Sequence, residues 1–195
     1  MKRFTNFPKI ALLLVWVSLL VCLGLKFETH EATPGPAAAP CSNWPTGSAL
    51  VADASRPTIL FFIHPQCPCT RASLNELDRI LSSYPGKAKV IAVVLSPKGM
   101  AADWSETDTT EHARRLPDAT MVKDPDGAEC KRFGVKTSGT VLVFSPGGSR
   151  ELFRGGLTAS RGHEGESAGG AAISHYLETG QMTINTAPVF GCFLF

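Results

Sequence analysis

The sequence lacks an excess of charge of either sign once its N-terminal segment is set aside. Its only charged residues before Glu28 are Lys2, Arg3, Lys9 and Lys26. Because these four are basic, the rest of the chain carries 15 basic residues against 17 acidic ones, a formal charge of about −2. No nucleic-acid partner is therefore expected. The chain also has no internal repeat, which excludes a solenoid or a propeller.

Charge is also absent from the apolar stretch IALLLVWVSLLVCLGL, which runs from Ile10 to Leu25. It has no polar face, so a buried core helix is a poor interpretation. No small-x-small cleavage site follows it, and Val21 is too bulky for a good lipoprotein box before Cys22. We therefore expect an uncleaved transmembrane helix over residues 10–27, with a cleaved signal peptide or a lipoprotein as the alternative. The basic residues before it place residues 1–9 in the cytoplasm and the domain on the periplasmic, extracytoplasmic side of the cell membrane.

Beyond this anchor the chain divides into a tether, a domain and a tail. Residues 28–45 are rich in proline and alanine, which predicts a semi-extended tether. A domain over residues 46–180 and an apolar tail over residues 181–195 follow. Five cysteines lie beyond the anchor, namely Cys41, Cys67, Cys69, Cys130 and Cys192. An odd number means that at least one is unpaired, intermolecular or a ligand.

Within the domain, predicted strands alternate with predicted helices. Runs of apolar and β-branched residues predict strands over 58–63, 88–96, 119–123, 140–144 and 151–154. A helix directly after Cys69, and others over 105–115, 128–133 and 166–179, complete an α/β pattern, with Ser105 as the expected cap of the second. Six glycines between residues 155 and 170 predict an irregular loop.

The turn HPQCPC joins the first strand to the first helix. A helix N-terminus favours a thiolate, and Cys67 comes first in the turn, so we expect it to be the nucleophile. Cys67 and Cys69 stand two apart in an extended turn, which directs both sulfurs to one point. That geometry suits a strained, easily reduced disulfide, or two thiolates on copper(I) or zinc. His64 either assists Cys67 or is a strand-end histidine bonded to the backbone.

Two distant segments are expected to reach this edge of the sheet. If the last strand runs parallel to the first, Arg161, His163 and Glu164 emerge beside Cys67, although His163 could also be a solvated loop residue. The tail PVFGCFLF is long enough to return to the cysteines and too apolar to remain in solvent. Cys192 is then a resolving cysteine, a third metal ligand or a small buried residue, whereas Cys130 is expected to be structural.

A βαβ unit followed by a β-hairpin and a final helix resembles the thioredoxin-like superfamily over residues 57–179. FFIHPQCPC corresponds to its active-site strand and turn, and SGTVLVFSPGG to the strand after its substrate loop. HPQCPC, GGLTASRGHEG and PVFGC together are similar to the bacterial RedB group. The resemblance implies a substrate loop containing Gly139 and Thr140. Here Ser138-Gly139-Thr140 stands where the superfamily carries a cis-proline.

The sequence thus predicts a thioredoxin-like sheet flanked by helices, with an N-terminal transmembrane helix. The expected function is a membrane-anchored thiol–disulfide oxidoreductase acting on protein or small-molecule thiols and disulfides, with no required cofactor. The alternative is a copper or zinc carrier that uses Cys67 and Cys69, with His163 or Cys192 as candidate further ligands. Peroxide reduction is disfavoured because no threonine stands three residues before Cys67.

Overall fold

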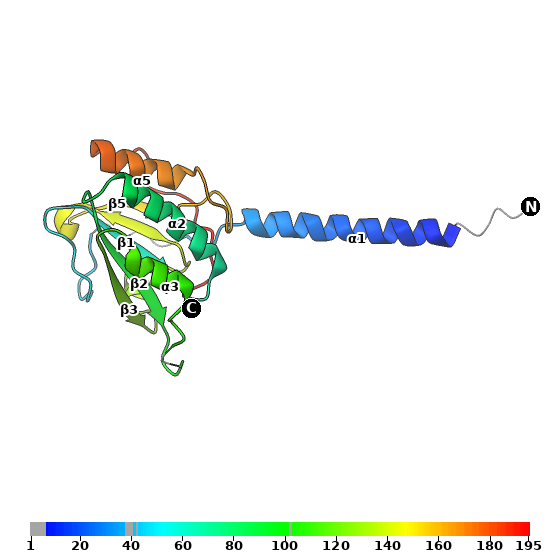
Figure 1. Ribbon diagram of the computed structural model, residues 1–195, viewed down its shortest axis with the longest axis horizontal. Helices are drawn as coiled ribbons and strands as arrows, with labels where there is room; N and C mark the ends of the chain where they lie inside the picture. Colours follow the sequence, from blue (N-terminus) through cyan, green and yellow to red (C-terminus); the bar gives the residue numbers. More distant parts are fainter. Residues whose placement is uncertain (1–6, 38–40, 42, 102) are drawn as a thin grey trace, which may run out of the picture. The chain divides into compact units, whose positions relative to one another are not determined.

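The computed structural model describes residues 7–37, 41, 43–101 and 103–195, and the chain forms two compact units, Met1–Thr33 and Pro34–Phe195 (Figure 1). The first unit contains helix α1 (Phe7–Ala32), which is long and apolar enough to cross a membrane, as a signal sequence would also be. This helix continues past the expected end of the anchor at residue 27 into the expected tether. The sequence places residues 1–9 in the cytoplasm. Of these, residues 1–6 lie outside the described part of the chain.

The second unit is built on a five-stranded sheet in the order β3-β2-β1-β4-β5. Its strands are β1 (Thr58–Ile63), β2 (Lys89–Ser96), β3 (Ala119–Pro125), β4 (Val141–Phe144) and β5 (Glu151–Gly155). The first three are mutually parallel, whereas β4 runs antiparallel to both β1 and β5. This confirms the expected thioredoxin-like fold and makes β5 parallel to β1.

Helices cover both faces of this sheet. They are α2 (Pro68–Ser83), α3 (Asp108–Arg115), α4 (Ala128–Arg132) and α5 (Ala168–Thr179), with a short 3₁₀ turn at Pro146–Gly148. Helices α2 and α5 lie side by side over the sheet, as Figure 1 shows. Ser167 caps α5 by accepting a hydrogen bond from the amide of Gly170, and Gly180 ends it in the left-handed conformation.

The central strand β1 is buried on both faces, as its continuous apolar sequence predicts. Ile59, Phe61 and Ile63 belong to the core cluster that also contains the apolar residues of α2 and α5. Leu60 and Phe62 face the opposite cluster, which contains residues of α4 and the loop after it. Because β1 packs against a core cluster on each face, the turn that follows its carboxyl end, which contains Cys67, starts from a firmly held strand.

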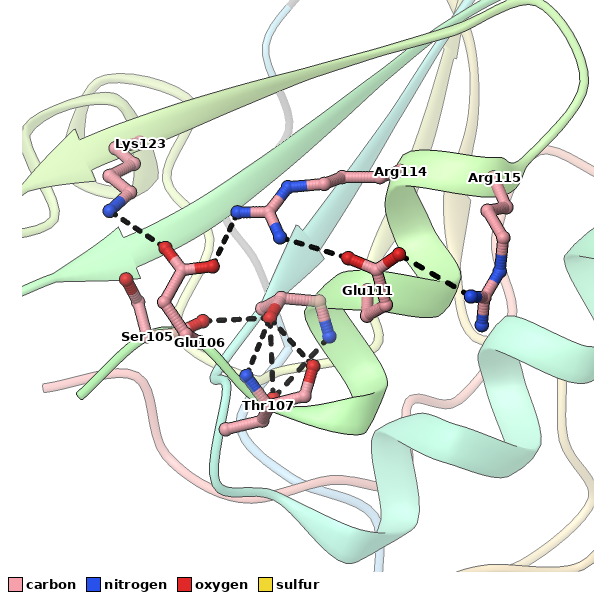
Figure 2. A network of polar contacts seen from close by, with 8 residues as sticks. Ser105, Glu106, Thr107, Glu111, Arg114, Arg115 and Lys123 are labelled. Carbon is pink, nitrogen blue, oxygen red and sulfur yellow. Dashed lines mark hydrogen bonds and ion pairs between the residues drawn. The ribbon is translucent and has the colours of Figure 1, made fainter. Parts of the chain in front are cut away.

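Helix α3 is anchored to that turn at its first residues. The expected cap, Ser105, precedes the helix, and Thr107 caps it instead by exchanging hydrogen bonds with Thr110 (Figure 2). The hydroxyl of Thr107 also donates to the carbonyl oxygen of Pro65 at 3.1 Å. Figure 2 shows a chain of ion pairs beside the cap, which joins Lys123, Glu106, Arg114, Glu111 and Arg115. The segment facing the cysteine turn is therefore held at several points.

Candidate redox site

Cys67 lies where β1 ends and α2 begins. Its amide donates to the carbonyl of His64 at 3.0 Å, which closes the turn after the strand. Cys67 is the N-cap of α2, and Pro68 is the first helical residue, where its missing N–H and fixed φ cost the helix nothing. The side chain is only 2% exposed, so Cys67 does not lie open at the surface.

Several donors point at the sulfur of Cys67. The amide of Cys192 lies 3.3 Å from it, and the thiol of Cys192 and the hydroxyl of Thr70 are also hydrogen-bonded to it. Burial by itself raises the pKa of Cys67, but these hydrogen bonds from Cys192 and Thr70 outweigh burial and lower it. The environment therefore favours a thiolate at Cys67.

Cys69 is the second residue of α2, in agreement with the expected start of the helix at or next to this residue. Partial burial and then the neighbouring Cys67 charge raise its pKa, against the opposing charge of Arg161. Cys67 precedes the helix as its N-cap, with extended backbone angles of φ −88° and ψ 113°, and Cys69 lies within hydrogen-bonding reach of it. That the two sulfurs act together on one substrate or ion stays a prediction.

A chain of hydrogen-bonded polar groups from His64, Ser138 and Thr70 leads to Cys67. The amide of His64 donates to the hydroxyl of Ser138 at 2.7 Å, and that hydroxyl lies 2.6 Å from the hydroxyl of Thr70. Ser138 and Thr70 are fully buried. If each hydroxyl donates once, Ser138 donates to Thr70, and the proton of Thr70 is directed at Cys67. One network thus joins the end of β1, the first turn of α2 and the loop before β4.

His64 joins the hydrogen-bond network around Cys67 through its backbone amide, which donates to Ser138, and its ring makes separate contacts. Its Nδ1 accepts a hydrogen bond from the amide of Gln66 at 3.2 Å, and its ring stands edge-on to Trp104. Burial lowers the pKa of His64, which favours the neutral ring. With Nδ1 engaged by Gln66, only Nε2 remains for acid–base chemistry.

Gly139 and Thr140 shape the expected substrate loop, and the neighbouring Ser138 contacts the hydroxyl of Thr70. Gly139 adopts φ +86°, and its amide donates to the carbonyl of Phe62 at 2.8 Å. Thr140 is buried, and its hydroxyl donates to the carbonyl of Thr137 at 2.6 Å. The structure contains no cis peptide bond among the described residues, and Ser138 contributes both an amide and a hydroxyl at this position.

The glycine-rich loop after β5 brings one of its expected residues to the cysteines. The guanidinium of Arg161 interacts with Cys69 and lies close enough to Cys192 to lower its pKa. Its Nη1 also donates to the carbonyl of Gly191 at 2.6 Å. His163 is exposed and hydrogen-bonds to the carbonyl of Arg161, while Glu164 accepts from Asn75 of α2. Arg161 is therefore at the site, and His163 points to its own loop.

The tail returns to the domain, as its apolar sequence predicts. Val189, Phe190 and Leu194 are buried, whereas Phe193 and Phe195 are exposed. Burial raises the pKa of Cys192 to about 12, with further contributions from its hydrogen bond to Cys67 and from the charges of Cys67 and Cys69. The Cys192 thiol is therefore harder to ionise than the Cys67 thiol beside it.

An open groove of about 580 Å³, with both polar and apolar lining, reaches Cys67 from the side of α3. It is lined by residues of the cysteine turn, the start of α2 and the start of α3, namely Pro65, Gln66, Cys67, Pro68, Arg71, Thr107, Asp108 and Thr109. Cys67 is therefore buried next to the tail but borders an open surface on one side.

The structure gives no positive support to a metal site. No group of three or more His, Cys, Asp or Glu side chains converges closely enough to hold an ion within the residues that the structure describes. Metal binding by Cys67, Cys69, His163 or Cys192 remains a prediction.

Cys130 is fully buried. Burial first, and then its contact with Asp124, strongly raise the pKa of its thiol, which fits an inert core residue.

Sequence reasoning did not identify Thr70 and Ser138 as parts of the site. Thr70 is the third residue of α2, a position from which a side chain can reach back to the N-cap. Ser138 was noticed only as a replacement for proline, and nothing in the sequence shows that its hydroxyl joins His64 to Thr70.

No protein-family model and no curated protein matches this chain. Two solved structures are similar over most of it. A hypothetical protein from Sinorhizobium meliloti has a TM-score of 0.62 and 16% identity, covering 81% of this chain and 96% of its own. An uncharacterized conserved protein from Geobacillus kaustophilus has a TM-score of 0.58 and 19% identity, covering 84% and 92%.

A secreted disulfide oxidoreductase from Mycobacterium tuberculosis matches less well, with a TM-score of 0.43 and 13% identity over 66% of this chain and 94% of its own. At these identities the similarities to solved structures describe the fold. The chemistry of this chain has to be argued from its own cysteines.

Proposed function

We propose that this protein is a membrane-anchored, extracytoplasmic thiol–disulfide oxidoreductase whose nucleophile is Cys67. The observation that carries the proposal is the set of hydrogen bonds aimed at the sulfur of Cys67 from Thr70 and Cys192 at the start of α2. An inert core cysteine has no need of such donors, and burial alone would keep it protonated, as it does Cys130.

The reaction begins when the Cys67 thiolate attacks one sulfur of a substrate disulfide. The substrate S–S bond breaks, its second sulfur leaves as a thiolate, and a mixed disulfide forms with Cys67. A second thiol of this chain, Cys69 or Cys192, then attacks the sulfur of Cys67 and releases the first substrate sulfur as a thiolate. The substrate gains two electrons, and the protein becomes a disulfide that an external dithiol must reduce again.

The similarity of HPQCPC, GGLTASRGHEG and PVFGC to the RedB group agrees with this proposal, as does the open groove beside Cys67. Protein or small-molecule disulfides are the substrates expected at such a groove. The apolar helix α1 supports an anchored location, with basic residues on its N-terminal side favouring an extracytoplasmic domain.

The test compares a Cys67→Ser variant with a Cys41→Ser variant of the full chain in detergent. Cys41 is half-buried, and its sulfur donates to the carbonyl of Phe133, a contact that serine can preserve. We expect Cys67→Ser to abolish reduction of a model disulfide by the pre-reduced protein, and Cys41→Ser to leave it intact. Equal activity of the two variants would refute the role of Cys67.

A further inference from the structure

The segment Gly191–Leu194, here called the tail strand, pairs with the loop Lys136–Ser138 beside the redox site. The amide of Ser138 donates to the carbonyl of Cys192 at 2.8 Å, and the amide of Leu194 donates to the carbonyl of Lys136 at 2.9 Å. Thr137 and Phe193 form an antiparallel bridge between these two bonds. The tail strand is therefore held in a defined register.

Close packing allows little freedom in that register. A Cβ atom on Gly191 would lie 1.9 Å from the carbonyl oxygen of Ser138, so only glycine fits at this point. The guanidinium of Arg161 holds the carbonyl of Gly191 from the other side. Leu194 is 3% exposed and inserts into the core, which fixes the far end of the tail strand. Together these contacts put Cys192, and no other tail residue, at the sulfur of Cys67.

Cys69 is less well placed to become the disulfide partner of Cys67. The two thiols lie within hydrogen-bonding reach of each other, but Cys67 is the N-cap of α2 and Cys69 its second residue, so a bond between them would close a small, strained ring across the start of the helix. Joining them would distort the first turn, in which Pro68 occupies the first helical position and the amide of Thr70 donates to the carbonyl of Cys67. Cys192 approaches from a separate strand, and its amide already lies 3.3 Å from the sulfur.

We propose that Cys192 is the resolving cysteine, and that the oxidised protein contains a Cys67–Cys192 disulfide while Cys69 stays a thiol. This inference rests on the proposed function of Cys67. The Cys192 thiolate attacks the Cys67 sulfur of the mixed disulfide, the new S–S bond forms, and the substrate sulfur leaves as a thiolate that takes up the proton released by Cys192. The resulting bond ties the tail strand covalently over the site.

The protonation of Cys192 fits this order of events. While Cys67 is a thiolate, its charge is among the causes that raise the pKa of Cys192, so the two thiols do not ionise together. Once Cys67 is in a mixed disulfide that charge is gone, and the guanidinium of Arg161, whose charge lowers the pKa of Cys192, remains beside it. Formation of the mixed disulfide thus removes one of the causes that raise the pKa of Cys192, while burial, the largest cause, persists.

The test uses the full chain in detergent, reduced and then treated with one equivalent of oxidised glutathione. Free thiols are blocked, and the disulfides are located by mass spectrometry in the wild type, Cys69→Ser and Cys192→Ser. We expect the Cys67–Cys192 bond in the wild type and in Cys69→Ser. In Cys192→Ser we expect the glutathione–Cys67 mixed disulfide to persist at least about tenfold longer, because an intramolecular thiol has a millimolar or higher effective concentration.

A second pair of variants tests the role of the tail strand without removing a thiol. Gly191→Ala should displace the strand from Ser138 and slow formation of the Cys67–Cys192 bond, whereas Phe193→Ala, at a side chain that is 64% exposed, should not. A Cys67–Cys69 bond in the oxidised wild type, with Cys192 free to be blocked, would overturn the inference and leave the role of Cys67 intact. If Cys67 forms no mixed disulfide in any variant, the proposed function itself fails.

Discussion

Replacing Thr70 by valine removes one hydrogen-bond donor from the sulfur of Cys67 and keeps nearly the same shape. Thr70 is fully buried, so the lost donor is not replaced by water. A hydrogen bond to a charged group contributes about 1.5–3 kcal/mol. At fixed pH this corresponds to a roughly ten- to hundredfold lower thiolate-to-thiol ratio at Cys67. The pKa of Cys67 should therefore rise in Thr70→Val.

The assay is the ultraviolet absorbance of the thiolate as a function of pH. Because the chain has six cysteines, the signal of Cys67 is taken as the difference between each protein and the same protein carrying Cys67→Ser. Thr58→Val is the matched control, since Thr58 is equally buried but accepts its hydrogen bond from Asp53 at the opposite end of β1.

Stability gives an independent check with a definite sign. Since the pKa of Cys67 is lowered in the folded state, the stabilisation by its thiolate is fully present above the pKa of an unfolded thiol, and it is lost as the pH falls through the folded pKa. The difference in unfolding free energy between wild type and Thr70→Val should therefore widen from neutral to alkaline pH. Identical titrations for wild type, Thr70→Val and Thr58→Val would refute the proposed direction of the hydroxyl network.

Two further predictions concern the loop and the anchor. Ser138→Ala removes a fully buried hydroxyl that accepts from the partly buried amide of His64, and it should lower the free energy of unfolding by about 1–3 kcal/mol. Denaturant unfolding beside Ser82→Ala, an exposed serine of α2, measures this, and equal losses would contradict it. The full chain should stay in the membrane pellet after alkaline extraction, with its domain digested by protease added outside intact spheroplasts, whereas a chain starting at Pro34 should be released; release of both proteins would argue against an anchor.

The fold was predictable because its signals are local. The apolar run of β1, the helical spacing of Leu74, Leu77 and Leu81, and the glycine after α5 each depend on neighbouring residues. The position of Cys67 at the strand–helix junction follows from the same signals. Capping was less predictable, since Ser105 and Thr107 are both good caps and only the contact of Thr107 with Pro65 distinguishes them.

The site was only partly predictable because its decisive contacts are distant in sequence. The sequence indicates that the tail returns, but the steric fit of Gly191 against Ser138 sets which residue meets Cys67. The exposure of Cys67 was expected to be high, and it is low because the tail strand covers it. The position of Arg161 followed correctly from strand direction. For His163 the sequence left both a site role and a solvated loop position open, because the path of a glycine-rich loop is set by contacts such as that of Glu164 with Asn75.

The hydrogen bond from Cys192 to Cys67 joins residues 125 positions apart. During synthesis Cys67 emerges long before the segment that covers it, so every new molecule passes through a period in which its nucleophile has no lid and lacks two of its donors. In that period the thiol is both more accessible and less acidic than in the finished protein. Folding of this chain thus changes the chemical reactivity of Cys67 as well as its surroundings, and the change is complete only when the tail strand pairs with Lys136–Ser138.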